Sequence, residues 1–108
     1  MARKRRSGSK LAAVRRRIDR LDRQLLRLLN QRVRFALEIG RIKRRRRWPV
    51  FDARREAVVL RHVTRANRGP LSPRAVAHIF QAILSECRRR ERVSSRKKPD
   101  GRHRVSRS

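Results

Sequence analysis

The amino-acid sequence predicts an all-α fold, and three observations lead to this prediction. Apolar residues recur in alternating steps of three and four, no stretch shows the two-residue alternation of a strand, and no proline or glycine interrupts residues 11–39. The pattern resolves into one long and two shorter helical segments. We expect one helical domain over residues 10–93, between a basic head (1–9) and a basic tail (94–108) that are too polar to fold and are predicted to be disordered.

The first predicted helix is unusually long for a chain of this size. It runs from Leu11 to about Arg45, ahead of Pro49, and would span roughly 50 Å, whereas a compact chain of this length has a radius of gyration of about 13 Å. One chain cannot cover such a helix, so we predict an intertwined homodimer with the long helices packed about a two-fold axis. The residues of its apolar seam are Leu11, Val14, Ile18, Leu21, Leu25, Leu28, Phe35 and Ile39.

The two shorter helices have clear start signals. Asp52 is expected to cap the second helix, which stops at the segment 67–70. Ser72 followed by Pro73 predicts the start of the third helix, because the hydroxyl caps free amides and proline at the first position sacrifices no hydrogen bond. The apolar positions of these helices are Val59, Leu60 and Val63, then Val76, Ile79, Phe80, Ile83 and Cys87.

Composition limits the partners and the compartment. Lys and Arg number 35 against 8 Asp and Glu, a formal net charge of +27 that favours anionic partners, including non-specific binding of anions or nucleic acid. The single cysteine, Cys87, excludes an intramolecular disulfide and favours a reducing compartment. We expect no signal peptide and no membrane span, hence a cytoplasmic protein.

Two cations interrupt the apolar seam of the long helix. Arg32 lies where an apolar residue is expected, and Lys43 follows eleven residues later, which returns it to within about 20° of the same face. Their charges require either acidic side chains from elsewhere or an anionic ligand, unless the long side chains simply extend to solvent. Arg15 lies roughly 25 Å away along the helix, but an antiparallel partner helix could bring it to the same cavity.

The series LxxVRxxIDxLDxxLLxLLxxR, IGxIK and PVxDxxRE, in this order and spacing, resembles the all-helical chorismate mutases over residues 11–91. This resemblance implies an isomerase that rearranges chorismate to prephenate in phenylalanine and tyrosine biosynthesis. It also implies a homodimer with two equivalent sites, each completed by an arginine of the other chain. The reaction is pericyclic, so no nucleophile, metal or redox cofactor is expected. His62, His78 and His103 have no metal-site spacing.

By this resemblance, three cations surround the substrate. Arg15 of the other chain in the dimer is expected to bind one substrate carboxylate, and Arg32 of the same chain the other. Each guanidinium group can form two parallel hydrogen bonds with a carboxylate. Lys43 is expected at the ether oxygen, where negative charge grows as the carbon–oxygen bond breaks.

The remaining expected site residues lie in the second and third helices. In the DxxRE segment, Glu56 would hold the substrate hydroxyl while Asp52 and Arg55 help position the ring; without the resemblance, we would interpret Asp52 and Arg55 as a cap and an exposed charge. Cys87 stands where a serine often contacts substrate, but a thiol there can simply fill the helix face. Glu91 could donate to the ether oxygen only when protonated, so activity is expected to fall as it ionises.

Two other functions compete with the mutase. Isochorismate pyruvate lyase shares the architecture and a similar cationic pocket, and the complete RE pair and Glu91 favour the mutase over it. A nucleic-acid-binding helical protein is suggested by the charge and by the run of arginines at 44–47. The scarcity of aromatic residues for base stacking argues against this second rival.

Overall fold

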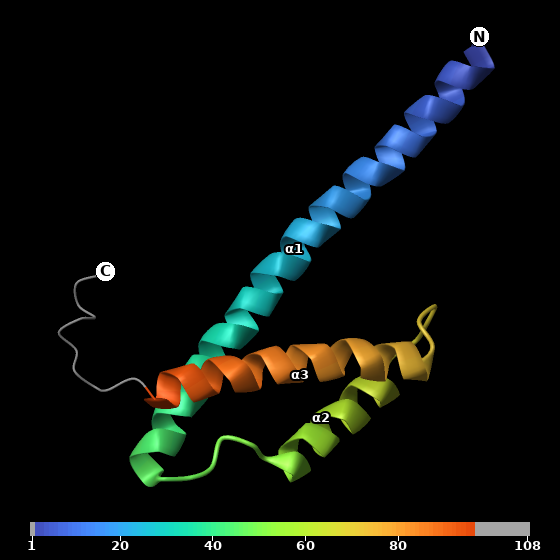
Figure 1. Ribbon diagram of the computed structural model, residues 1–108. Coiled ribbons are helices and arrows are strands. Elements are labelled where there is room, and N and C mark those ends of the chain that lie inside the picture. Colours follow the sequence, from blue (N-terminus) through green and yellow to red (C-terminus); the bar gives the residue numbers. More distant parts are fainter. Residues whose placement is uncertain (1, 97–108) are drawn as a thin grey trace, which may run out of the picture. The chain divides into compact units, whose positions relative to one another are not determined.

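The structure is a computed structural model that describes the backbone of residues 2–96 and the side chains of residues 8–93. Within these residues the chain forms three α-helices and no strand (Figure 1): α1 (Ala2–Arg46), α2 (Ala53–Ala66) and α3 (Pro73–Arg96). The prediction of an all-α fold with one long and two shorter helices is confirmed.

The ends of two helices differ from the sequence-based expectation. Helix α1 begins at Ala2, so residues 2–9, for which composition predicts disorder, are helical. Alanine, arginine and lysine are favourable helix formers, and no proline stops the helix from extending toward the N-terminus. Helix α3 continues to Arg96, into the predicted disordered tail. The rest of that tail, residues 97–108, lies outside the described residues.

The chain divides into an N-terminal unit, residues 1–31, and a C-terminal unit, residues 32–108. In the N-terminal unit the predicted apolar seam of α1 is exposed, with fractional exposures from 48% to 61% for its six members. These residues are Leu11, Val14, Ile18, Leu21, Leu25 and Leu28. An apolar stripe of this extent on a helix is normally buried against a partner surface.

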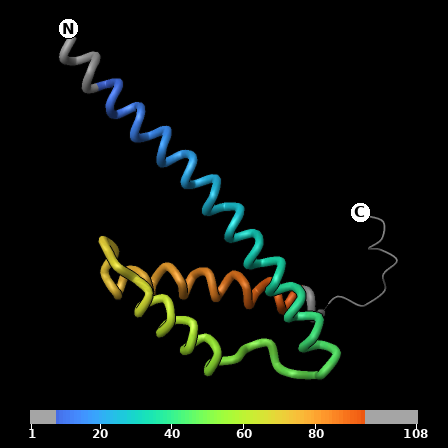
Figure 2. Tube along the Cα trace, turned by 180° about the vertical axis from the view of Figure 1, so that it is seen from behind, coloured from blue at the N-terminus to red at the C-terminus, as the bar shows by residue number. Residues whose placement is uncertain are grey.

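The C-terminal unit contains the core. Helices α2 and α3 pack side by side (Figure 2). Side-chain hydrogen bonds join residues 32–46 of α1 to α3. The buried apolar residues are Ala36, Val59, Val76, Leu84 and Cys87. Among the described residues no large side chain is completely buried, so the core of a single chain is small.

The predicted caps form as expected and fix the ends of α2 and α3. The Asp52 carboxylate accepts a hydrogen bond from the Arg55 amide at 3.0 Å, which makes Asp52 the N-cap of α2. The Ser72 hydroxyl accepts from the Ala75 amide at 3.0 Å, and α3 begins at Pro73. The Asp52 cap fixes the residue at which α2 begins. It therefore also fixes the positions of the side chains in the first turn of this helix.

Helix α1 ends in a Schellman motif. The Trp48 amide donates to the Lys43 carbonyl at 2.8 Å, and the Arg47 amide donates to the Arg44 carbonyl at 3.1 Å. Arg47 closes the motif with a φ of 59°, in the left-handed region that favours glycine. The motif ends α1 at Arg46, one turn after Lys43, and leads the chain into the connector to α2.

An Arg47→Gly substitution is expected to raise the free energy of unfolding by about 1 kcal/mol, because glycine adopts the left-handed conformation without steric cost. Chemical denaturation followed by circular dichroism would measure the change. The control Arg45→Gly places glycine inside the last turn of α1 and is expected to destabilise the protein by about the same amount. Equal destabilisation by both variants would show that the left-handed conformation of Arg47 has no steric cost that glycine relieves, which would contradict this prediction.

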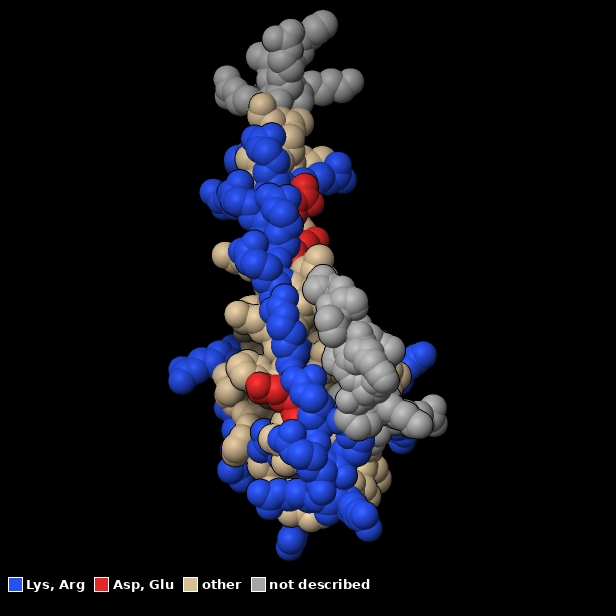
Figure 3. Space-filling view, turned by 90° about the vertical axis from the view of Figure 1, so that its left-hand side faces the viewer, with Lys and Arg blue, Asp and Glu red and all other residues tan. Residues whose placement is uncertain are grey.

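Basic side chains cover much of the face seen in Figure 3, where Asp and Glu are few. This distribution follows from the net charge of +27. Within the described part of the chain, no helix is both long and apolar enough to pass through a membrane.

Candidate functional site

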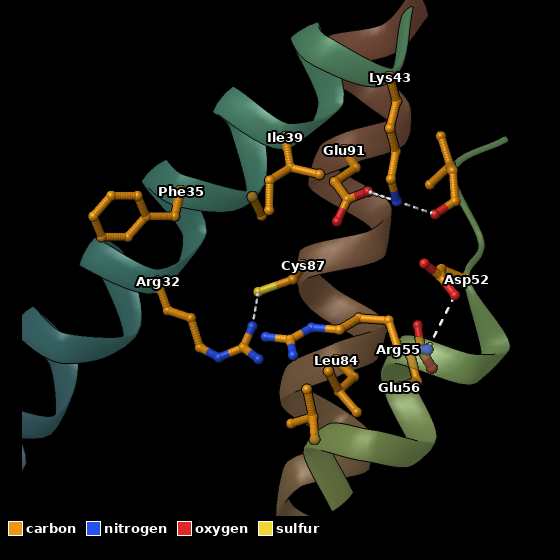
Figure 4. Close-up of a pocket in the computed structure, with 13 residues that line it drawn as sticks. Arg32, Phe35, Ile39, Lys43, Asp52, Arg55, Glu56, Leu84, Cys87 and Glu91 are labelled. Carbon is orange, nitrogen blue, oxygen red and sulfur yellow. Dashed lines mark hydrogen bonds and ion pairs between the residues drawn. The ribbon is translucent and has the colours of Figure 1, made fainter. Parts of the chain in front are cut away.

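A cavity of about 490 Å³ opens in the C-terminal unit. Its walls come from α1 after residue 31, from the connector to α2, from the first two turns of α2, and from α3 (Figure 4). The charged residues of its lining are Arg32, Lys43, Asp52, Arg55, Glu56 and Glu91, and the remaining residues are Phe35, Ala36, Ile39, Val50, Val59, Leu84 and Cys87. This volume is in the range of small-molecule sites.

Lys43 is held by two acceptors at one end of the cavity. Its Nζ donates to the Val50 carbonyl at 2.7 Å and to Glu91 Oε1 at 2.9 Å. The side chains of Lys43 and Glu91 are 15% and 14% exposed, so solvent screens the ion pair little. An ammonium group has three N–H donors, and these two bonds leave one for a ligand.

Two arginines meet at the other end of the cavity. Arg32 comes from α1 and Arg55 from the first turn of α2, and Figure 4 shows their guanidinium groups pointing toward each other across the pocket. Among the described residues no carboxylate forms an ion pair with either group. Two like charges in this arrangement are stabilised by an anion between them, and a carboxylate matches the guanidinium fork.

Cys87 combines packing with a polar contact. It is 4% exposed in the face of α3, as expected of a small apolar residue, but its Sγ also accepts a hydrogen bond from Arg32 Nη1 at 3.2 Å. The interpretation of Cys87 as a simple space-filling residue is therefore incomplete. The thiol helps to orient Arg32, which the sequence could not show because the two residues lie 55 positions apart.

Asp52, the N-cap of α2, and Glu56, in the first turn of this helix, have different hydrogen-bond partners. Asp52 lines the pocket while its carboxylate caps the helix. Glu56 lines the pocket as well, and its Oε2 accepts from Arg88 Nη1 at 2.5 Å. Asp52 is thus both the N-cap of α2 and a residue of the cavity lining.

Seven of the eight residues expected in the site lie together around this cavity. The exception is Arg15, an exposed residue of the N-terminal unit that does not line it. Sequence reasoning missed the carbonyl of Val50 and the guanidinium of Arg88. A backbone acceptor leaves no signal in the sequence, and Arg88 is one of three consecutive arginines that the sequence alone cannot rank.

The charges of the cavity indicate its ligand. Lys43 is paired with Glu91, Glu56 is paired with Arg88, and Asp52 interacts with the N-terminus of α2. The guanidinium groups of Arg32 and Arg55 remain available, so the site fits a small molecule with a carboxylate. No three His, Cys, Asp or Glu side chains in the described ranges gather into a group that could hold a metal ion.

Comparison with known proteins identifies relatives of this chain. Residues 14–92 match the family described as chorismate mutase type II. The chain is 43% identical over 82 residues to a bifunctional chorismate mutase/prephenate dehydratase of Pseudomonas aeruginosa, covering 71% of this chain and 22% of that protein. A protein of the same name from Neisseria gonorrhoeae is 41% identical over 70 residues, covering 65% of this chain and 19% of that protein. The chain thus spans about a fifth of the length of these curated relatives.

A solved structure agrees with the sequence matches. The form II structure of a chorismate mutase from Thermus thermophilus superposes with a TM-score of 0.76 and 32% sequence identity, covering 77% of this chain and 94% of that chain. The family match includes every residue that lines the cavity. The chain therefore belongs to the chorismate mutase type II family.

Proposed function

We propose that this chain is a chorismate mutase, an isomerase that converts chorismate to prephenate by an intramolecular Claisen rearrangement in phenylalanine and tyrosine biosynthesis. The observation that carries the proposal is the arrangement of charges in the cavity, with two guanidinium groups at one end that form no ion pair with a described carboxylate and a fixed ammonium group at the other. The named relatives are bifunctional, and this chain spans only about a fifth of their length, so the proposal is limited to the mutase activity.

The two carboxylates of chorismate are bound by arginines. Arg32, oriented by Cys87, binds one carboxylate from within the chain. Arg15 of a second chain binds the other, and Arg55 helps to neutralise the dianion and position the ring together with Asp52. Bidentate guanidinium–carboxylate contacts select the compact conformer in which the two reacting carbons approach each other.

Lys43 stabilises the transition state. In the rearrangement the ether carbon–oxygen bond breaks while a carbon–carbon bond forms, and negative charge grows on the ether oxygen. The one N–H of Lys43 that is not bonded to Val50 or Glu91 is available to donate to this oxygen. Since the two acceptors hold the ammonium group before the reaction, the interaction requires little reorganisation and favours the transition state over the ground state.

Glu91 holds Lys43 in position. As a carboxylate it accepts from Lys43 and offsets part of the lysine charge. A Glu91→Gln variant keeps an acceptor for Lys43 and adds an N–H donor for the ether oxygen, so it is expected to retain kcat with chorismate, whereas Glu91→Ala, which removes both groups, should lower it. Equal kcat for the two variants would contradict this role.

The active form proposed here is a homodimer. The exposed seam of the N-terminal unit supplies an apolar surface suited to a second copy of the same helix, as residues spaced three and four apart on two helices interdigitate. An antiparallel arrangement of two α1 helices would bring Arg15 of each chain to the cavity of the other. The single free thiol, buried at Cys87, supports a cytoplasmic location as part of the same proposal.

The proposal is tested by incubating the purified protein with chorismate and measuring prephenate formation, beside a parallel sample with isochorismate. Prephenate formation supports the mutase, whereas release of pyruvate from isochorismate would favour the lyase. Turnover of neither substrate would contradict both enzymes. The net charge of +27 predicts salt-dependent, non-specific attraction of nucleic acid in either case, as a consequence of composition.

A further inference from the structure

Arg88 forms a contact that links three segments at the edge of the cavity. Its Nη1 donates to Glu56 Oε2 at 2.5 Å, and its guanidinium carbon lies 5.0 Å from the centroid of the Phe51 ring. The side chains of Arg88 and Glu56 are 25% and 24% exposed, so the pair is largely shielded from solvent. Arg88 does not line the cavity, whereas Glu56 does.

The contact restricts the carboxylate of Glu56. Without a partner, a glutamate in the first turn of a helix samples several rotamers. Arg88 reaches Glu56 from α3 and engages Oε2, so Oε1 has no bond to Arg88 and can accept a hydrogen bond from a ligand in the cavity. The Phe51 ring, from the connector before α2, supports the guanidinium group through a cation–π contact.

The contact also changes the charge that a ligand meets. The cavity lining contains three cations and three anions. A dianionic substrate would be repelled by a bare carboxylate at Glu56, and the guanidinium of Arg88 compensates this charge from outside the lining. The exposed pair of Arg89 and Glu86 on the same helix, at 3.8 Å, has no comparable link to the cavity.

We propose that Arg88 is a positioning residue for the mutase reaction, which holds Glu56 so that its free oxygen accepts the hydroxyl of the substrate and which compensates the glutamate charge. The inference rests on the proposed mutase function and assigns to Arg88 no direct contact with substrate. It predicts that the effect of Arg88 on catalysis is transmitted through Glu56.

A double-mutant cycle tests this proposal with chorismate as substrate. Arg88→Gln is expected to raise KM and to lower kcat/KM about 10-fold to 100-fold, because a misplaced carboxylate affects both binding and alignment. Arg88→Lys should lower kcat/KM less than Arg88→Gln does, because lysine keeps the positive charge although it lacks the two-donor geometry of the guanidinium group. In a Glu56→Gln background the Arg88→Gln substitution should change kcat/KM less than 3-fold, because contacting residues are not additive.

Several outcomes would overturn the inference. It fails if Arg88→Gln lowers kcat/KM equally with and without Glu56→Gln, or if its effect is no larger than that of the control Arg89→Gln. Thermal unfolding by circular dichroism shows whether each variant is folded, and Arg88→Lys provides the comparison if Arg88→Gln is not. An unmodified protein without mutase activity would contradict the proposed function itself, whereas an active protein indifferent to Arg88→Gln would contradict only the role of Arg88.

Discussion

Replacing Lys43 by alanine is expected to lower kcat for the conversion of chorismate to prephenate by at least about 10²-fold to 10³-fold, the effect of removing one preorganised donor at a developing negative charge. The substitution also leaves Glu91 without its partner inside a cavity that must accept a dianion. Lys43→Ala therefore removes the donor to the ether oxygen and also leaves an uncompensated negative charge. We expect it to lower kcat more than substitution of any other single residue that lines the cavity. Loss of chorismate and formation of prephenate, followed by absorbance, measure it.

Arg45→Ala is the matched control for Lys43→Ala. Arg45 is an exposed cation two residues further along the same helix, and it does not line the cavity. Its removal should leave kcat within a factor of about two, because exposed charges outside a site contribute little. A Lys43→Ala variant that is folded and retains the kcat of the control would contradict the assignment of the ammonium group to the ether oxygen.

Placing charge in the seam of the N-terminal unit is expected to dissociate the proposed dimer. Leu25 is 55% exposed in the single chain, so a carboxylate there should be tolerated by a monomer. Buried against a partner, each leucine stabilises the interface by roughly 1.5–3 kcal/mol, and two-fold symmetry doubles the effect of Leu25→Asp. Sedimentation velocity at micromolar concentration should show the change from dimer to monomer or unfolded chain, with loss of mutase activity.

The control for the seam substitution is Arg20→Asp, on a face of α1 away from the seam. It introduces the same side chain at an exposed position and should leave the sedimentation coefficient and the activity unchanged. The dimer proposal would be contradicted if Leu25→Asp sedimented as the unmodified protein and remained fully active.

The fold was largely predictable because helical periodicity and capping are local properties. The steps of three and four, the Asp52 cap and the Ser72 start each depend on residues within one or two turns, and the structure confirms them. The start of α1 was less predictable. Residues 2–9 have no apolar face, so only their intrinsic helix propensity, a weak signal, favoured extension of the helix.

The site was predictable where one helix places the residues. Arg32 and Lys43 lie on one face of α1 by simple rotation, and both line the cavity. The contacts between elements were not predictable in the same way. The bonds from Lys43 to Glu91 and from Arg32 to Cys87 depend on how α3 packs against α1, and no spacing along the chain specifies that packing.

The most direct test of the shared active site is a mixture of two variants, Arg15→Ala and Lys43→Ala, each of which is expected to lose most of its mutase activity by itself. In a heterodimer of these chains one site has lost both residues, while the other combines an intact Lys43 with an intact Arg15 from its partner. Random exchange of subunits makes half of the dimers mixed, so the mixture should recover about a quarter of the unmodified activity. A mixture that forms heterodimers, as shown by co-purification of differently tagged chains, yet remains inactive would contradict a site completed by Arg15 of a second chain.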